Sequence, residues 1–208
     1  MKYIIAVAIC FSVSFSQAQL LKDFFSNKTQ VVLLGLDFTQ CKFIGRDGFG
    51  NPEGLKNYAI KAWNKFFATE PNKYSMQDAL GLKDKYYYNS INYFLKRNEE
   101  MVDTYSNVTN EDYHITLEQV QENVKTYDTF EKEGLAISFV VESFNKLENK
   151  AYIWVTFISL PENEVIYAER MEGKPGGAGQ ENYWARAVYD IVTQLEKRSD
   201  ELRSIRSF

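Results

Sequence analysis

The chain has 208 residues, with 24 basic and 28 acidic side chains and a formal net charge of −4. Nucleic-acid binding depends on clustered Lys and Arg, and the absence of a dense basic block argues against nucleic acid as a partner. Hydrophobic residues make up 45% of the sequence, so a chain of this length can bury a core without help from disulfides.

The first residues have the order of a secretory signal. Lys2 precedes an apolar run from Tyr3 to Phe15, and Ser16-Gln17-Ala18 resembles a cleavage site. The apolar run is shorter than the roughly 20 residues that cross a bilayer, although an uncleaved anchor is the competing interpretation. We therefore predict a signal peptide at residues 1–18 and one exported domain at residues 19–208, with no membrane-spanning segment after cleavage.

Removal of the signal leaves Cys41 as the only cysteine and His114 as the only histidine. A single cysteine cannot form a disulfide within its own chain, so the sequence leaves open a disulfide-linked dimer and the oligomeric state. Zinc sites need several Cys or His ligands, and we expect no metal and no cofactor. His114 is expected at the surface, since nothing in the sequence places it beside Cys41.

The run VVLLGLDF, residues 31–38, predicts a strand covered on both faces, and CKFIG is expected to continue it or pair beside it. Asn51 and Pro52 begin a helix that extends to about Ala68, with Trp63 in the core. Residues 69–115 have no periodicity that separates helix from strand.

The second half of the chain is easier to interpret. Thr116 and Gln119 have capping-box spacing, which predicts a helix from Leu117 to about Tyr127. Three runs rich in branched and aromatic residues then predict an antiparallel meander, at residues 134–144, 151–159 and 164–170. A final helix is expected from about Glu181 to Arg203. The predicted fold is α+β, with a single mixed β-sheet, a C-terminal antiparallel meander and helices packed mainly on one face.

Two acidic residues fall inside apolar strands. A carboxylate there is costly unless it is paired or lies at an edge, so Asp37 and Glu142 are the candidate catalytic acid and base. No Gly-x-Ser-x-Gly nucleophile elbow is present.

The segment GKPGGAGQENYWARAV, residues 173–188, concentrates glycine before the last helix. A P-loop needs Gly-Lys followed by a hydroxyl residue, and a dinucleotide loop needs a third glycine near the first strand; neither requirement is met. We predict a bend that joins the last strand to the helix. The alternative is a small anion nest formed by the amides of Gly177 and Gly179 beside Lys174.

The order of the signal, VVLLGLDF, AWNKFF, AISFVVESFNK, AYIWVTFISL and GGAGQENYWARAV resembles a group of exported proteins of Gram-negative bacteria. The layout is more distantly similar to envelope accessory domains such as the amino-terminal domain of TolB. These resemblances concern the layout of the chain and imply no activity. The signal, the acidic composition and the lack of a catalytic constellation favour a periplasmic or outer-surface protein that binds an envelope protein or glycan without catalysis. The alternative is a carboxylate-dependent enzyme acting on a cell-wall or carbohydrate substrate.

Overall fold

A computed structural model describes residues 19, 21–23, 25–26, 28–129 and 133–204. The predicted signal peptide, residues 1–18, lies outside the described residues. Everything that follows concerns the described part of the chain.

Seven strands form one mixed sheet. They are β1 (Val31–Asp37), β2 (Lys42–Ile44), β3 (Tyr87–Asn89), β4 (Val108–Thr109), β5 (Gly134–Asn145), β6 (Lys150–Leu160) and β7 (Glu164–Gly173). One edge of β5 pairs with β1 and then with β2, both in parallel, while β3 and β4 extend the sheet beyond them in parallel. On its other edge β5 pairs antiparallel with β6, and β6 pairs antiparallel with β7. The predicted α+β fold with a mixed sheet and a C-terminal antiparallel meander is therefore confirmed.

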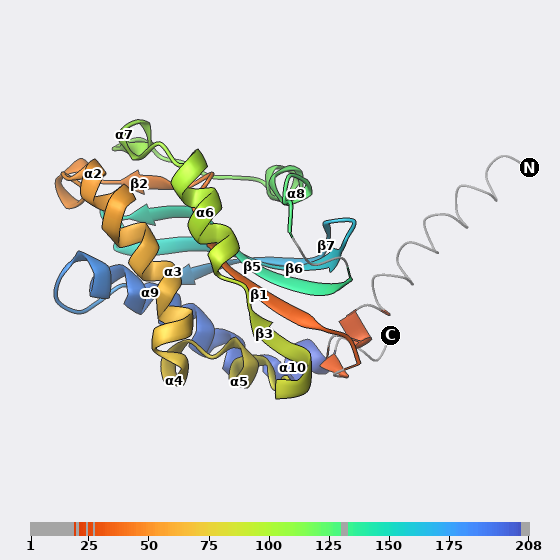
Figure 1. The fold of residues 1–208 in the computed structure, drawn as a ribbon. Helices are drawn as coiled ribbons and strands as arrows, with labels where there is room; N and C mark the ends of the chain where they lie inside the picture. The colour runs from red at the N-terminus through yellow and green to blue at the C-terminus, as the bar shows by residue number, and fades with distance from the viewer. Residues whose placement is uncertain (1–18, 20, 24, 27, 130–132, 205–208) are drawn as a thin grey trace, which may run out of the picture.

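The helices lie between the strands in the chain and, for the last two, after β7. They are α2 (Pro52–Gly54), α3 (Ile60–Thr69), α4 (Pro71–Tyr74), α5 (Met76–Leu80), α6 (Asn92–Met101), α7 (Thr104–Asn107), α8 (Leu117–Lys125), α9 (Gln180–Lys197) and α10 (Ser199–Ser204), with 3-10 turns η1 (Arg46–Gly48) and η3 (Asp84–Tyr86) and a π-helical turn η2 (Leu55–Ala59). Figure 1 shows α4, α5 and α9 below the sheet and α8 above it, with α3 and α6 crossing in front of the strands. Phe94 of α6 is buried in the same cluster as Val120 and Val124 of α8.

The core is divided by the sheet into two clusters. The larger cluster joins α3, α5 and α9 to the sheet, and at its centre the ring of Phe144 stacks on Trp184 at 4.7 Å with Trp63 beside it. The smaller cluster lies under α8, where Val120 and Val124 are buried with Val140 of β5. Trp63 is buried, as the helical spacing of its neighbours predicted.

β1 is buried along its whole length, as its continuous apolar run predicted. β3 pairs only with the first half of β1. Along the second half of this edge, side-chain amides from two helices form the hydrogen bonds to the β1 backbone. Asn64 of α3 accepts from Leu36 N at 2.8 Å and donates to Leu36 O at 3.0 Å. Asn98 of α6 donates to the same Leu36 O at 2.8 Å and accepts from Phe38 N at 2.8 Å. The buried backbone is thus satisfied without a neighbouring strand.

Both predicted helix starts are confirmed. The Asn51 side chain accepts from Gly54 N at 2.9 Å, and Thr116 and Gln119 form the reciprocal capping box. The helix after Asn51 is not uniform, because the π-helical turn η2 interrupts it before α3.

CKFIG continues the first strand, the first of the two arrangements that the sequence left open. β2 pairs in parallel with β5 beyond the part paired with β1, after a turn closed by Cys41 N and Phe38 O at 3.0 Å, and its other edge pairs with β4. One detail differs from expectation: the last helix divides at Arg198, whose φ of −100° and ψ of 4° leave helical geometry. Residues 69–115, which the sequence left unassigned, form several short elements.

Candidate functional site

The glycine-rich segment connects β7 to α9. Gly177 and Gly179 have positive φ angles of 99° and 80°, a region that residues with a Cβ rarely adopt. Gly179 is the N-cap residue of α9, and Gly176 N donates to Tyr183 O at 3.0 Å, which folds the segment back onto the first turn of the helix. This is the geometry of a bend.

Four cavities border this bend. Their volumes are about 480, 310, 440 and 280 Å³. Gly176 and Arg186 line both the first and the second, Asn182 lines the second and third, and Gly179 and Gln180 line the third and fourth. The hollows therefore adjoin one another, and we call residues 174–183 with these four cavities the loop surface.

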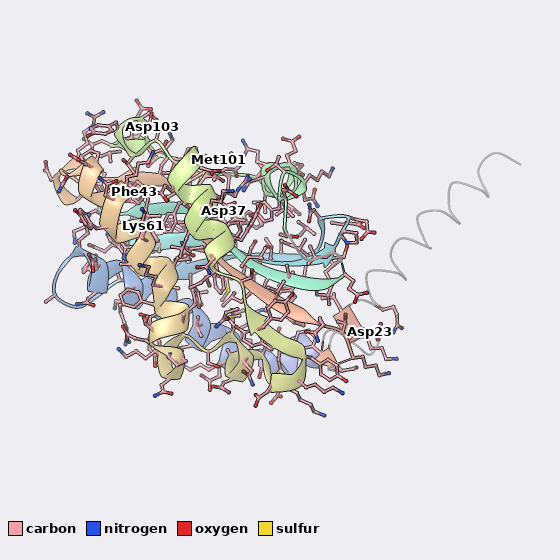
Figure 2. All side chains as sticks on the ribbon, in the orientation of Figure 1. Asp23, Asp37, Phe43, Lys61, Met101 and Asp103 are labelled. Atoms are coloured by element: carbon pink, nitrogen blue, oxygen red, sulfur yellow. The ribbon has the colours of Figure 1, made fainter. Side chains whose placement is uncertain are left out.

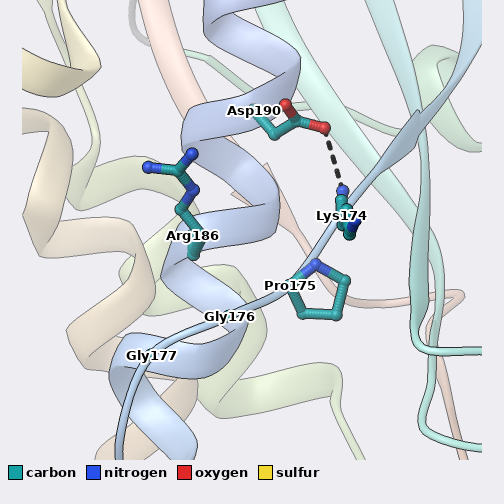
Figure 3. Close-up of a pocket in the computed structure, with 6 residues that line it drawn as sticks. All are labelled: Lys174, Pro175, Gly176, Gly177, Arg186 and Asp190. Carbon is teal, nitrogen blue, oxygen red and sulfur yellow. Dashed lines mark hydrogen bonds between the residues drawn. The ribbon is translucent and has the colours of Figure 1, made fainter.

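The first cavity contains three charged side chains. It is lined by Lys174, Pro175, Gly176, Gly177, Arg186 and Asp190, which Figure 3 shows around the strand-to-helix connection. Lys174 N donates to Asp190 Oδ2 at 3.0 Å. Within the described part of the chain, neither the Lys174 ammonium nor the Arg186 guanidinium forms an ion pair. Both cations are exposed and free to meet an anionic group.

Tyrosine rings lie at the other three cavities. Tyr58 is 71% exposed at the third cavity. The ring of Tyr189 lies 5.0 Å from the Arg186 guanidinium at the second, and the ring of Tyr183 lies 3.8 Å from Lys146 Nζ at the fourth. Rings with a polar end, flanked by cations, are suited to contact sugars or peptides.

The structure brings together only part of the predicted anion nest. Gly177 and Gly179 both line the fourth cavity, whereas Lys174 lines the first cavity with Gly177 but without Gly179. Asp190 places a carboxylate in the same cavity as Lys174, and Glu181 places another in the first turn of α9.

Asp37 lies at the end of β1 and is fully buried. Its Oδ1 accepts from Thr39 N at 2.9 Å and Thr39 Oγ1 at 2.6 Å, and its Oδ2 accepts from Asn123 Nδ2 at 2.8 Å and Tyr127 Oη at 2.7 Å. Arg97 Nε of α6 lies 3.8 Å from Asp37 Oδ2, and Figure 2 labels Asp37 at that helix. Burial, followed by the negative charge of Asp37, raises the pKa of Tyr127 well above its ordinary value. This carboxylate joins α6 and α8 to the sheet.

Glu142 lies on β5 and is also fully buried. The guanidinium of Arg170 on β7 binds both oxygens of Glu142: Nε donates to Oε2 at 2.9 Å and Nη2 donates to Oε1 at 2.7 Å. Trp154 Nε1 donates to Oε2 at 3.3 Å, and His114 Nδ1 lies 3.1 Å from Oε1. Burial alone would raise the pKa of Glu142, but the hydrogen bonds from Arg170 and His114 outweigh it and lower the pKa.

The two predicted acids are held by separate sets of partners. Asp37 is bound from α6 and α8, and Glu142 from β6, β7 and the segment before α8. In the described structure no hydrogen bond or ion pair joins the two carboxylates. Each is satisfied internally, and neither has exposed surface for a substrate.

The structure also places the other two residues that the sequence singled out, His114 and Cys41. The side chain of His114 is 71% exposed, as expected for a surface residue. Cys41 is fully buried, and burial raises the pKa of its thiol well above the ordinary value. Among the residues that the structure describes, no group of three or more His, Cys, Asp or Glu side chains could hold a metal ion.

Sequence reasoning missed Arg186, Asp190 and Arg170 as site residues. The first two are four residues apart on the last helix, a spacing at which opposite charges commonly pair. That spacing is the one signal that could have singled them out. Arg170 gave no signal, because its pairing with Glu142 depends on the register between β5, β6 and β7.

Comparisons with known proteins give no assignment for this chain: no protein-family model, no curated protein and no solved structure matches it. Among the helices that the structure describes, none is both long enough and apolar enough to cross a membrane.

Proposed function

We propose that this chain is an exported, non-enzymatic binding protein of the Gram-negative envelope, in the periplasm or at the outer surface, and that it holds a protein or glycan partner on the loop surface. The observation that carries the proposal is the group of adjoining cavities around residues 174–183, with Lys174 and Arg186 exposed in them. Export rests on the signal-like order of residues 1–18.

The charges of the loop surface favour a partner that carries anionic groups. Lys146 and Arg186 each lie against a tyrosine ring, so their charges are held at the surface beside an apolar face. Several adjoining cavities with tyrosine rings suit an extended polymer or a protein segment that spans them.

The experiment measures retention of envelope components by the immobilised protein. The test variant is Lys174→Ala with Arg186→Ala, and the charge-matched control is Lys96→Ala with Lys125→Ala, on α6 and α8. We expect the wild type and the control to retain the same protein or polysaccharide component, and the test variant to lose it. Retention should fall with added salt, because exposed charges are screened beyond about 8 Å at physiological ionic strength. Equal retention by both variants would show that the partner does not bind at the loop surface.

The enzymatic alternative has one specific observation in its favour. His114 is exposed while its Nδ1 contacts the buried Glu142, and a carboxylate-oriented histidine is an arrangement used for general bases. The test is release of soluble fragments from cell-wall polymer by the wild type and by His114→Gln. Turnover that His114→Gln abolishes, with unchanged thermal stability, would favour this second function.

A further inference from the structure

The first cavity is lined by two opposite charges of α9. Arg186 and Asp190 are one turn apart and line the same cavity, a spacing at which opposite charges can pair. No ion pair between them is present in the described structure.

Each of the two side chains has another contact instead. The Arg186 guanidinium lies over the Tyr189 ring, with its central carbon 5.0 Å from the ring centroid. Asp190 Oδ2 accepts from Lys174 N at 3.0 Å and from Gln194 Nε2 at 3.2 Å. Both bonds are on Oδ2, and among the described residues Oδ1 accepts no hydrogen bond. Asp190 is half-buried, which strengthens the interaction of its free oxygen with a cation.

The cavity therefore presents both signs of charge to a ligand. The backbone of Lys174 is fixed by Asp190, while its ammonium and the Arg186 guanidinium have no carboxylate partner in the described residues. An anion alone would be attracted by these two cations but repelled by Asp190. A molecule with an ammonium and a carboxylate close together would satisfy all three groups.

We propose that the cavity lined by Lys174, Arg186 and Asp190 binds a zwitterion of the α-amino acid class, with its ammonium on Asp190 Oδ1 and its carboxylate on Lys174 and Arg186. The volume of about 480 Å³ is within the range of small-molecule sites and admits a side chain beside the backbone groups. Pro175 supplies an apolar wall, as Figure 3 shows. This inference rests on the proposed function, since it names the group that the loop surface would recognise.

The test is NMR titration of the protein with three probes: L-alanine, N-acetyl-L-alanine, which lacks the ammonium, and L-alaninamide, which lacks the carboxylate. We expect L-alanine to shift the amides of Gly176 and Gly177 in a saturable way. Loss of either charged group should weaken binding roughly tenfold or more, as for removal of one partner of a charged hydrogen bond.

Two variants assign the contacts. Asp190→Asn keeps an acceptor for Lys174 N and should weaken L-alanine roughly tenfold while leaving N-acetyl-L-alanine unaffected or improved. Glu196→Gln, an exposed acid on the same helix, is the matched control and should change neither. Unchanged spectra elsewhere show that the variants fold.

Equal binding of L-alanine and N-acetyl-L-alanine would reduce the site to an anion pocket and overturn the inference. Saturation with none of the probes would also overturn it. Neither result bears on retention of an envelope partner, which is measured separately with the Lys174 and Arg186 variants.

Discussion

The side chain of Asn64 forms hydrogen bonds with the β1 backbone that a neighbouring strand would otherwise form. Its side-chain amide carries a carbonyl oxygen and an NH2 group, and it presents both to the backbone of Leu36, as a peptide group of a neighbouring strand would. Asn98 continues this pattern to Phe38. Two helices therefore complete the hydrogen bonding along the edge of β1 through these two buried asparagines.

Removal of the Asn64 amide should lower the free energy of unfolding. Asn64→Ala leaves Leu36 N without its acceptor in a fully buried position, and we expect a loss of about 1–3 kcal/mol in the free energy of unfolding. Denaturant unfolding measures it, with the exposed Asn92→Ala as the control. A loss of the same size in both variants would mean that the amide does not support β1.

Glu142 predicts a defined response to pH. Its pKa is lower in the folded state than the unfolded value of about 4.3, because Arg170 and His114 outweigh burial. The stabilisation is therefore present above the unfolded pKa and lost as pH falls through the folded pKa.

Arg170→Gln should remove this acid-dependent stability. It breaks a pair whose acid is fully buried, so we expect a loss of about 3 kcal/mol at neutral pH and a flatter decline of stability below pH 5. Thermal unfolding across a pH series measures both effects, and Arg46→Gln, on the exposed turn η1, is the control. An acid decline as steep as that of the wild type would contradict this role of the pair.

At the scale of elements, β7 and α9 meet closely at Gly173. A Cβ on Gly173 would collide with the carbonyl oxygen of Ala187, whereas a Cβ on Gly176 would lie 3.6 Å from Arg186 Cγ, an ordinary contact. The first glycine is required by close packing of a strand against a helix.

These two glycines give a matched pair of variants. Gly173→Ala should separate β7 from α9 at a cost of about 1–3 kcal/mol, while Gly176→Ala should change stability by less than about 0.5 kcal/mol. Chemical unfolding of both proteins measures the difference. Similar values for the two would show that the strand and helix can move apart freely.

The sequence predicted the elements whose causes are local. The apolar run of β1, the capping box at Thr116 and the meander each depend on residues close together in the chain, and all three are present. Asp37 and Glu142 were correctly expected to need partners, but the identity of those partners depends on long-range register. Arg170, for example, is 28 residues from Glu142 and meets it across two strand pairings.

The candidate site was less predictable than the fold. The glycines of residues 176–179 indicated a bend, yet the cavities beside it are formed by residues from η2, α4 and α9 that only packing brings together. The charges of Arg186 and Asp190 fit a solvated helix face equally well from the sequence. Their separate contacts, with Tyr189 and with Lys174 N, are what distinguish them.

At the scale of the whole molecule, Cys41 is shut off from solvent by the core around it. Cys41 is enclosed with a thiol whose pKa is raised by burial. We expect no disulfide-linked dimer on a non-reducing gel, and no alkylation of the thiol until denaturant is added. A dimer that reductant dissolves would show that the segment around Cys41 opens in the native protein.

The central claim is that the loop surface holds the partner. Hydrogen exchange of the protein, alone and bound to the component that it retains from the envelope, tests this claim most directly. We predict slower exchange at residues 174–183 and in η2, with no change in α8. Protection confined to α8 and the segment around His114, with the loop surface unchanged, would contradict it.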